Sequence, residues 1–176
     1  MSGNTTRLAV GLARGTEPAA IAAILITIFV MGVIAGALVG HFAQQKRAPA
    51  VLLLVSLLLA LAAGLDAIGL SRFAIAAMGL AMGAENAVFA QNGEVHIGLT
   101  YMTGTLVKMG HQIAATLLGG NAMGWWPFFL LWFGLAAGAV LGAALYPYLN
   151  LHSLWLASLV AFLCSWFARD GIESAS

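Results

Sequence analysis

Ionisable and strongly polar side chains are rare in this sequence, and a few of them are placed where they could bind a polar solute. Of the 176 residues, seven are Lys or Arg and six are Asp or Glu. In an otherwise apolar chain, such groups are costly and usually face a cavity, an opposite charge or a bound solute. We expect six residues to form substrate-binding positions: Asn4, Arg7, Glu85, Asn86, Lys108 and His111.

Glu85 is an isolated carboxylate within an apolar run, and the next acid along the chain is Glu94. A carboxylate in this setting is either neutral or paired with a cation, and Lys108 and His111 are the candidate partners. The pair could be a structural salt bridge, or Glu85 could couple protons or contact substrate. The sequence leaves these alternatives open, together with simple solvent exposure of Glu85.

The segment around Lys108 is amphipathic at helical spacing. At 100° per residue one half of its surface carries Thr100, Gly104, Lys108, His111, Gln112 and Thr116. A similar stripe near the start of the chain carries Gly3, Asn4, Arg7, Gly11 and Arg14. Arg7 and Lys108 therefore either line a polar pathway or belong to short interfacial helices in which the long cation snorkels to water.

Other kinds of chemistry lack their sequence signals. The four histidines show no His-x-x-x-His or Glu-x-x-His spacing, and Cys164 is the single cysteine, so we predict no metal site and no cofactor. No phosphate loop, nucleophile elbow or Ser-His-acid set is present, so we predict that the protein is not an enzyme. The formal net charge of +1 argues against a nucleic-acid partner.

The elements that would position these residues are membrane helices. Apolar residues make up 62% of the chain and charged residues 7%, against roughly 45–50% and about 25% in soluble domains. The apolar runs long enough to span a bilayer cover residues 18–42, 48–68, 73–90, 125–145 and 151–168. Residues 100–118 are less apolar and either cross or re-enter. Lys46 and Arg47 place the loop between the first two runs in the cytoplasm.

Two parts of the chain resemble each other. Residues 1–9 align with residues 102–110 at an offset of 101, and two glycine ladders match at an offset of 102. The ladder residues are Gly32, Gly36, Gly40, Gly134, Gly138 and Gly142. Glycines four apart let membrane helices approach closely, so we assign these positions to helix packing.

These matches predict an all-α, polytopic transmembrane bundle built from two internal repeats, residues 1–68 and 69–176. The second repeat has a helix before its Met-Thr-Gly segment, whereas the first begins at that segment. We expect the first repeat to lack its opening helix, either because the chain is shortened at its N-terminus or because that helix is dispensable.

Three segments carry a family resemblance: Met1–Thr5, Gly83–Ala87 and Thr100–Thr105. Together they resemble the YoaK-like family, bacterial membrane proteins classed as a domain of unknown function. The resemblance covers essentially the whole chain and implies an all-helical fold in the bacterial inner membrane. Two features depart from the family: the helix that precedes the Gly-Asn-Thr motif is absent, and Glu85 stands where glutamine is expected. The resemblance implies no reaction or substrate.

The sequence therefore favours a multi-pass inner-membrane protein that transports a small solute or ion, or acts like a channel, with an unknown substrate. Duplicated units with polar or broken helices are common among secondary transporters. The alternative is a non-transporting scaffold or accessory subunit that packs through its glycine-rich helix faces. The expected partners are the lipid bilayer, a small solute or ion, and a second copy in a homo-oligomer.

Overall fold

A computed structural model describes residues 1–88, 90–91, 94–95 and 102–173. Its first half contains α1 (Ser2–Arg14), α2 (Pro18–Ala43), η1 (Gln44–Lys46), α3 (Arg47–Ala67), α4 (Ser71–Ala84) and η2 (Glu85–Ala87). Its second half contains β1 (Ala90–Gln91), β2 (Glu94–Val95), α5 (Met102–Leu117), α6 (Trp126–Leu149), η3 (Asn150–His152) and α7 (Ser153–Glu173). The strands pair antiparallel through two residues each. The predicted all-helical fold is thus confirmed, apart from this short pair of strands.

Two continuous helical stretches are long and apolar enough to cross a membrane, Pro18–Ala67 and Trp126–Arg169. Each contains two helices separated by a 3-10 turn. The turns follow Ala43 and Leu149, where Gln44 and Asn150 each adopt a φ of 47°. A residue with positive φ cannot continue a right-handed helix, so the chain changes direction there. The second helix of each stretch, α3 or α7, begins after that turn.

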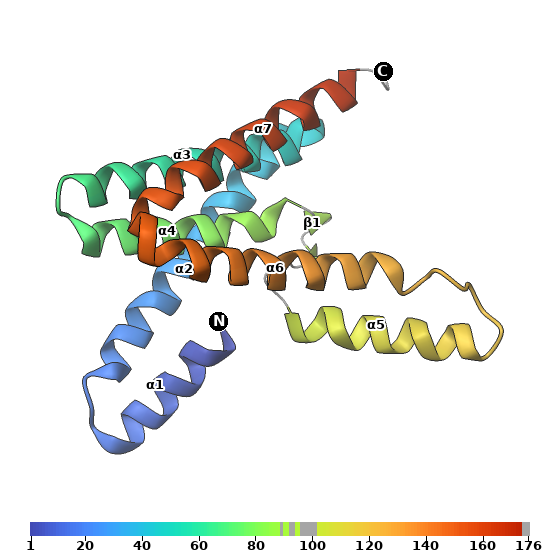
Figure 1. Cartoon of the computed structure of the whole chain (residues 1–176), viewed down its shortest axis with the longest axis horizontal. Helices are drawn as coiled ribbons and strands as arrows, with labels where there is room; N and C mark the ends of the chain where they lie inside the picture. Colours follow the sequence, from blue (N-terminus) through green and yellow to red (C-terminus); the bar gives the residue numbers. More distant parts are fainter. Residues whose placement is uncertain (89, 92–93, 96–101, 174–176) are drawn as a thin grey trace.

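The helices α3 and α7 lie side by side (Figure 1). Ser56 Oγ donates to the carbonyl of Ser158 at 2.9 Å, and Ser158 Oγ donates to the carbonyl of Ser56 at 2.8 Å. To one side of this pair, Ser165 Oγ donates to the carbonyl of Pro49 at 2.8 Å. Residue numbers rise along α3 as they fall along α7, so the helices are antiparallel. All three serines are buried.

The helices α2 and α4 approach each other through glycines on both sides of the contact. A Cβ added to Gly36 would lie 2.6 Å from the Ala84 carbonyl oxygen, and one at Gly32 would collide with the Leu80 carbonyl. In return, Gly83 lies against the backbone of Phe29 and Val33. No larger side chain fits at these positions without separating the two backbones.

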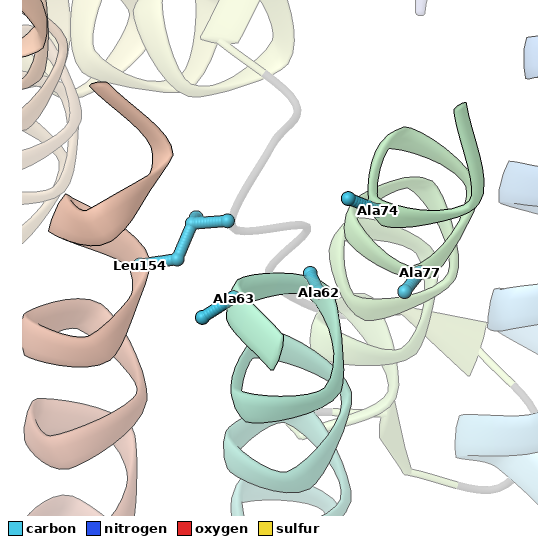
Figure 2. Close-up of a cluster of buried hydrophobic side chains, with 5 residues drawn as sticks. All are labelled: Ala62, Ala63, Ala74, Ala77 and Leu154. Carbon is cyan, nitrogen blue, oxygen red and sulfur yellow. The ribbon is translucent and has the colours of Figure 1, made fainter. Parts of the chain in front are cut away.

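Small residues also fill the contact among α3, α4 and α7. Figure 2 shows Leu154 of α7 beside four alanines of α3 and α4. The alanines are Ala62, Ala63, Ala74 and Ala77, all buried. Because the alanine side chains are short, α3 packs closely against α4 on one side and α7 on the other.

Two helical hairpins complete the fold, and one of them includes α2 of this core. The hairpins are α1 with α2 and α5 with α6 (Figure 1). Large apolar side chains along α6 and the outer faces of α2 and α7 are exposed, including Ile34, Val140 and Phe167. In a lipid environment such surfaces contact acyl chains rather than water.

The reciprocal serine contact predicts matched losses of stability. Ser56→Ala and Ser158→Ala each remove one interhelical hydrogen bond and leave the other in place. We expect each substitution to lower the unfolding free energy by about 0.6–1.7 kcal/mol, the range for such bonds in membranes. The double variant should lose less than the sum, because each single substitution already removes the 3.3 Å contact between the two Oγ atoms. Denaturant unfolding in detergent measures these values.

Thr27→Val is the control for the serine variants, because the Thr27 hydroxyl is exposed and donates to Ala23 of its own helix. It should change stability by less than either serine substitution. Serine losses no larger than that of Thr27→Val would contradict a structural role for the pair.

Candidate functional site

The angle between α1 and α2 encloses two open cavities that share Arg7. The larger, about 510 Å³, is lined by Thr6, Arg7, Val10, Gly11, Arg14, Thr16 and Pro18. The smaller, about 310 Å³, is lined by Asn4, Arg7, Pro18, Ile21, Ala22 and Leu25. Asn4 and Arg7, both predicted substrate-binding residues, therefore lie at one site.

Local sequence explains why the two helices meet at this angle. Gly15 ends α1 in the left-handed conformation, with φ 63°, and its N–H bonds back to the carbonyls of Gly11 and Leu12. Pro18 then begins α2, where its fixed φ suits a first helical turn. Gly11 is buried against Ala19, and a Cβ at Gly11 would lie 2.8 Å from the Ala19 Cβ. This close contact brings the cationic face of α1 toward α2.

The site is cationic with apolar walls. Arg7 and Arg14 are seven residues apart, so they share a face of α1 and lie about 10 Å apart along its axis. The described residues that line the two cavities include no carboxylate. Glu17, in the turn between the helices, is exposed and is not a lining residue. Such a surface suits an anionic group better than a cation.

Glu85 and Asn86 lie in a second place, directly after α4. Asn86 is buried, and its Nδ2 donates to the carbonyl of Met82 at 2.9 Å and to that of Gly83 at 3.4 Å. Its amide thus caps carbonyls in the last turn of α4, a structural task that was not predicted from the sequence. Glu85 is half-buried. The predicted span over residues 73–90 differs from the structure, because α4 ends at Ala84.

Lys108 and His111 lie in a third place, on α5, and both side chains are exposed. Within the described residues, α5 packs against α6, and no comparable packing joins it to α4 or η2. The six predicted binding residues therefore fall on three segments, and the structure brings Asn4 together with Arg7. The predicted cluster of Glu85, Lys108 and His111 is not supported by helix packing.

The six ladder glycines also divide into groups. Gly32 and Gly36 contact the backbone of α4, as described above. Gly40 instead lies under a side chain, because a Cβ there would be 2.6 Å from Arg47 Nε.

The α6 ladder differs from the predicted packing. No heavy atom among the described residues comes within 4 Å of a Cβ built at Gly134, Gly138 or Gly142. All three glycines are exposed. Helix packing within this chain therefore accounts for the α2 ladder and not for the α6 ladder.

Some residues of the α1–α2 site were not predicted from the sequence. Thr6, Arg14 and Thr16 line the larger cavity but were not among the predicted binding residues. The spacing of Arg7 and Arg14 carried a usable signal, whereas the contribution of Thr16 depends on how the turn folds. In the part of the chain that the structure describes, no three His, Cys, Asp or Glu residues are grouped as metal ligands would be.

A helical core of small residues, apolar outer surfaces and two membrane-length stretches define a membrane protein, and the comparisons agree. The chain belongs to the family Protein of unknown function (DUF1275), whose model matches residues 1–167. It is similar to a UPF0700 transmembrane protein of Rhizobium meliloti (strain 1021). The two share 37% identity over 163 residues, covering 93% of this chain and 71% of the relative. No solved structure matches the chain. The resemblance to the YoaK-like family thus holds at the coarser level of an uncharacterised family of membrane proteins.

The hydrogen bonds of Asn86 predict that its side chain must be a donor rather than an acceptor. Asn86→Asp replaces the donating Nδ2 with a carboxylate oxygen, so the buried carbonyls of Met82 and Gly83 lose their donor and face a negative charge. We expect the unfolding free energy to fall by about 1–3 kcal/mol, the cost of an unsatisfied buried polar group. Thermal unfolding of the purified protein in detergent measures the change.

Asn121→Asp is the matched control, because Asn121 Oδ1 accepts from the Met123 N–H at 3.0 Å and an aspartate keeps that acceptor. Its melting temperature should stay close to that of the unchanged protein. Equal effects at the two positions would contradict the capping role of Asn86.

Proposed function

We propose that this protein is a small-solute or ion transporter, or a channel-like protein, of the bacterial inner membrane. In this proposal it crosses the membrane several times and has no catalytic role. The observation that carries the proposal is the position of Arg7, which lines both cavities between α1 and α2. Arg7 is exposed on α1, beside the apolar helix α2, and ionisable residues in membrane proteins usually face a cavity or a solute pathway.

The helix α1 is too short to cross a bilayer by itself. Its 13 residues extend about 20 Å, which is shorter than the roughly 30 Å hydrocarbon core. A short polar helix beside the 26-residue α2 resembles the interrupted helices that form transporter binding sites.

Similarity between the two halves also supports the proposal. The order α1, α2, η1, α3 has the same pattern as α5, α6, η3, α7. Ser56 and Ser158, which exchange hydrogen bonds, are 102 residues apart, the offset that relates the glycine ladders. We propose that residues 1–68 and 69–176 are repeats related by a local two-fold axis near this serine pair.

The second half would contribute its own polar residues to the pathway. Lys108 occupies the position on α5 that matches Arg7 on α1 at the offset of 101, and His111 lies one turn further on. Glu85 lies at the end of α4 and is half-buried. In this scheme Arg7 and Asn4 bind solute in the first repeat, whereas Lys108, His111 and Glu85 act in the second.

A liposome swelling assay tests the transport function with a panel of solutes that differ in charge and size. The purified protein is reconstituted, and the entry of urea, glycerol, potassium chloride, potassium acetate and potassium phosphate is followed by light scattering. We expect at least one solute to enter faster than into protein-free liposomes. Arg7→Gln should remove most of this increase, because Arg7 lines both cavities.

Arg72→Gln is the control for transport. Arg72 is an exposed cation at the start of α4 and lines neither cavity, so its removal should leave entry unchanged. Entry no faster than into protein-free liposomes for all five solutes would contradict the proposal, and so would equal losses in the two arginine variants.

The α6 ladder favours a second candidate function, that of a scaffold or accessory subunit. In α2, the Gly32 and Gly36 positions contact another helix that itself presents Gly83. The exposed glycines of α6 are spaced in the same way, and a helix with small residues would fit against them. A second copy of this chain carries such a helix, its own α6, which gives a homo-oligomer.

Gly138→Leu tests the scaffold function by size-exclusion chromatography with light scattering. If two α6 ladders pack together, the unchanged protein elutes as an oligomer, and Gly138→Leu elutes as a folded monomer. Gly110→Leu, at an α5 glycine with nothing within 4 Å among the described residues, should leave the oligomer intact. Gly36→Leu should instead prevent folding, because a leucine at this position would collide with the backbone of α4. A monomeric unchanged protein would contradict this candidate.

A further inference from the structure

We propose that the α1–α2 site, whose two cavities are described above, binds a phosphate-type oxyanion through Arg7 and Arg14. The inference builds on the proposed function, because it names the class of ligand for the same site. It rests on three observations: the two arginines, the polar groups around them and the apolar walls.

The arginines supply the charge and the geometry. A guanidinium is planar, is charged at every physiological pH and presents paired N–H donors that match the oxygens of phosphate or carboxylate. Arg7 borders both cavities, and Arg14 lies two turns further along the same face of α1, at the edge of the larger cavity. An oxyanion at Arg7 is therefore within the field of a second cation, and the lining residues include no carboxylate to compete with it.

Neutral polar side chains surround the arginines. Asn4 lines the smaller cavity, and its Nδ2 contacts Met1 Sδ at 3.5 Å, so the second N–H of the amide is left for a ligand. Thr16 contributes a hydroxyl to the larger cavity. The Thr6 hydroxyl donates to the Ser2 carbonyl at 3.2 Å, so Thr6 acts as a wall rather than as a donor.

The other walls are apolar, and both cavities are open to the surroundings. Val10 and Pro18 flank the larger cavity, and Ile21 and Leu25 flank the smaller one. Arg7 and Arg14 are exposed, so charge-assisted hydrogen bonds to the guanidinium groups, rather than burial, would hold the oxyanion. The volume of about 510 Å³ is within the usual range of small-molecule sites, about 300–1,000 Å³. A free solute and a phospholipid headgroup can both supply the oxyanion, and the chemistry at Arg7 is the same for the two sources.

Ligand-induced stabilisation of the full chain in a neutral detergent tests the inference. Inorganic phosphate is titrated against potassium chloride of equal ionic strength, and phosphatidylglycerol is titrated against phosphatidylcholine. A ligand that binds the folded state raises the melting temperature in a concentration-dependent way, from which an apparent Kd follows. Stabilisation by phosphate identifies a free anion as ligand, whereas stabilisation by phosphatidylglycerol alone identifies a lipid headgroup. Either result supports the inference when it depends on Arg7.

The variants show whether the ligand occupies this site. Arg7→Gln and Arg14→Gln should each raise the apparent Kd about tenfold or more, as expected when a charge-assisted pair is lost. Arg72→Gln should leave it unchanged. Arg7→Lys keeps the positive charge but loses the paired N–H donors of the guanidinium. Its Kd should therefore lie between those of the unchanged protein and Arg7→Gln. This variant decides the outcome if Arg7→Gln does not elute as folded protein.

Several results would overturn the inference. One is the absence of stabilisation by both phosphate and phosphatidylglycerol beyond their controls. Another is an equal loss in Arg72→Gln, which would indicate a general effect of surface charge. Because binding is measured without flux, the two proposals fail separately: binding without entry of any solute overturns transport alone, and entry without anion binding overturns this inference alone.

Discussion

The close approach of helix backbones is the constraint on which the rest of this structure depends. Lipid chains are as apolar as leucine side chains, so hydrophobic burial does not hold helices together inside a bilayer. The bundle instead uses contacts that work at short range: Gly36 against the Ala84 carbonyl, and the exchanged hydrogen bonds of Ser56 and Ser158. Both require small side chains at the crossing. The largest side chains can then point outward, where acyl chains solvate them.

The same constraint determines where polar groups can be placed. The α3–α7 and α2–α4 contacts leave little space, and the polar side chains within or beside them have structural partners, as Asn86 does at the end of α4. The α1–α2 hairpin differs, because the helices pack most closely at Gly11 and Ala19, near the turn, and leave cavities beside this contact. A ligand can enter these cavities without separating the closely packed helices. Binding and stability are thus assigned to different parts of the molecule.

Much of this fold could be predicted from the sequence, because hydropathy and glycine spacing report directly on membrane helices. The runs over residues 18–42 and 48–68 correspond closely to α2 and α3. The same signals could not distinguish Gly36 from Gly138, since both sit in apolar ladders and only the neighbouring helix differs. Hydropathy also extended α4 beyond Ala84, because it does not detect the 3-10 turn at Glu85. Helix pairing is a property of three-dimensional arrangement, and a single sequence contains little information on it.

Part of the candidate site could likewise be predicted from the sequence, and part could not. Periodicity placed Asn4 and Arg7 on one face of a helix, and this local prediction agrees with the cavities that they line. The predicted contact of Glu85 with Lys108 and His111 required knowing which helix α5 packs against, and charge complementarity alone suggested α4. In the structure α5 packs against α6, with Gln112 of α5 close to Gly124, just before α6. If the halves are repeats, this is the arrangement to expect, because the partner of α1 is α2 and the partner of α5 is then α6. Each cationic helix pairs with the long apolar helix that follows it, so Arg7 and Lys108 belong to two separate hairpins on the shared α3–α7 core.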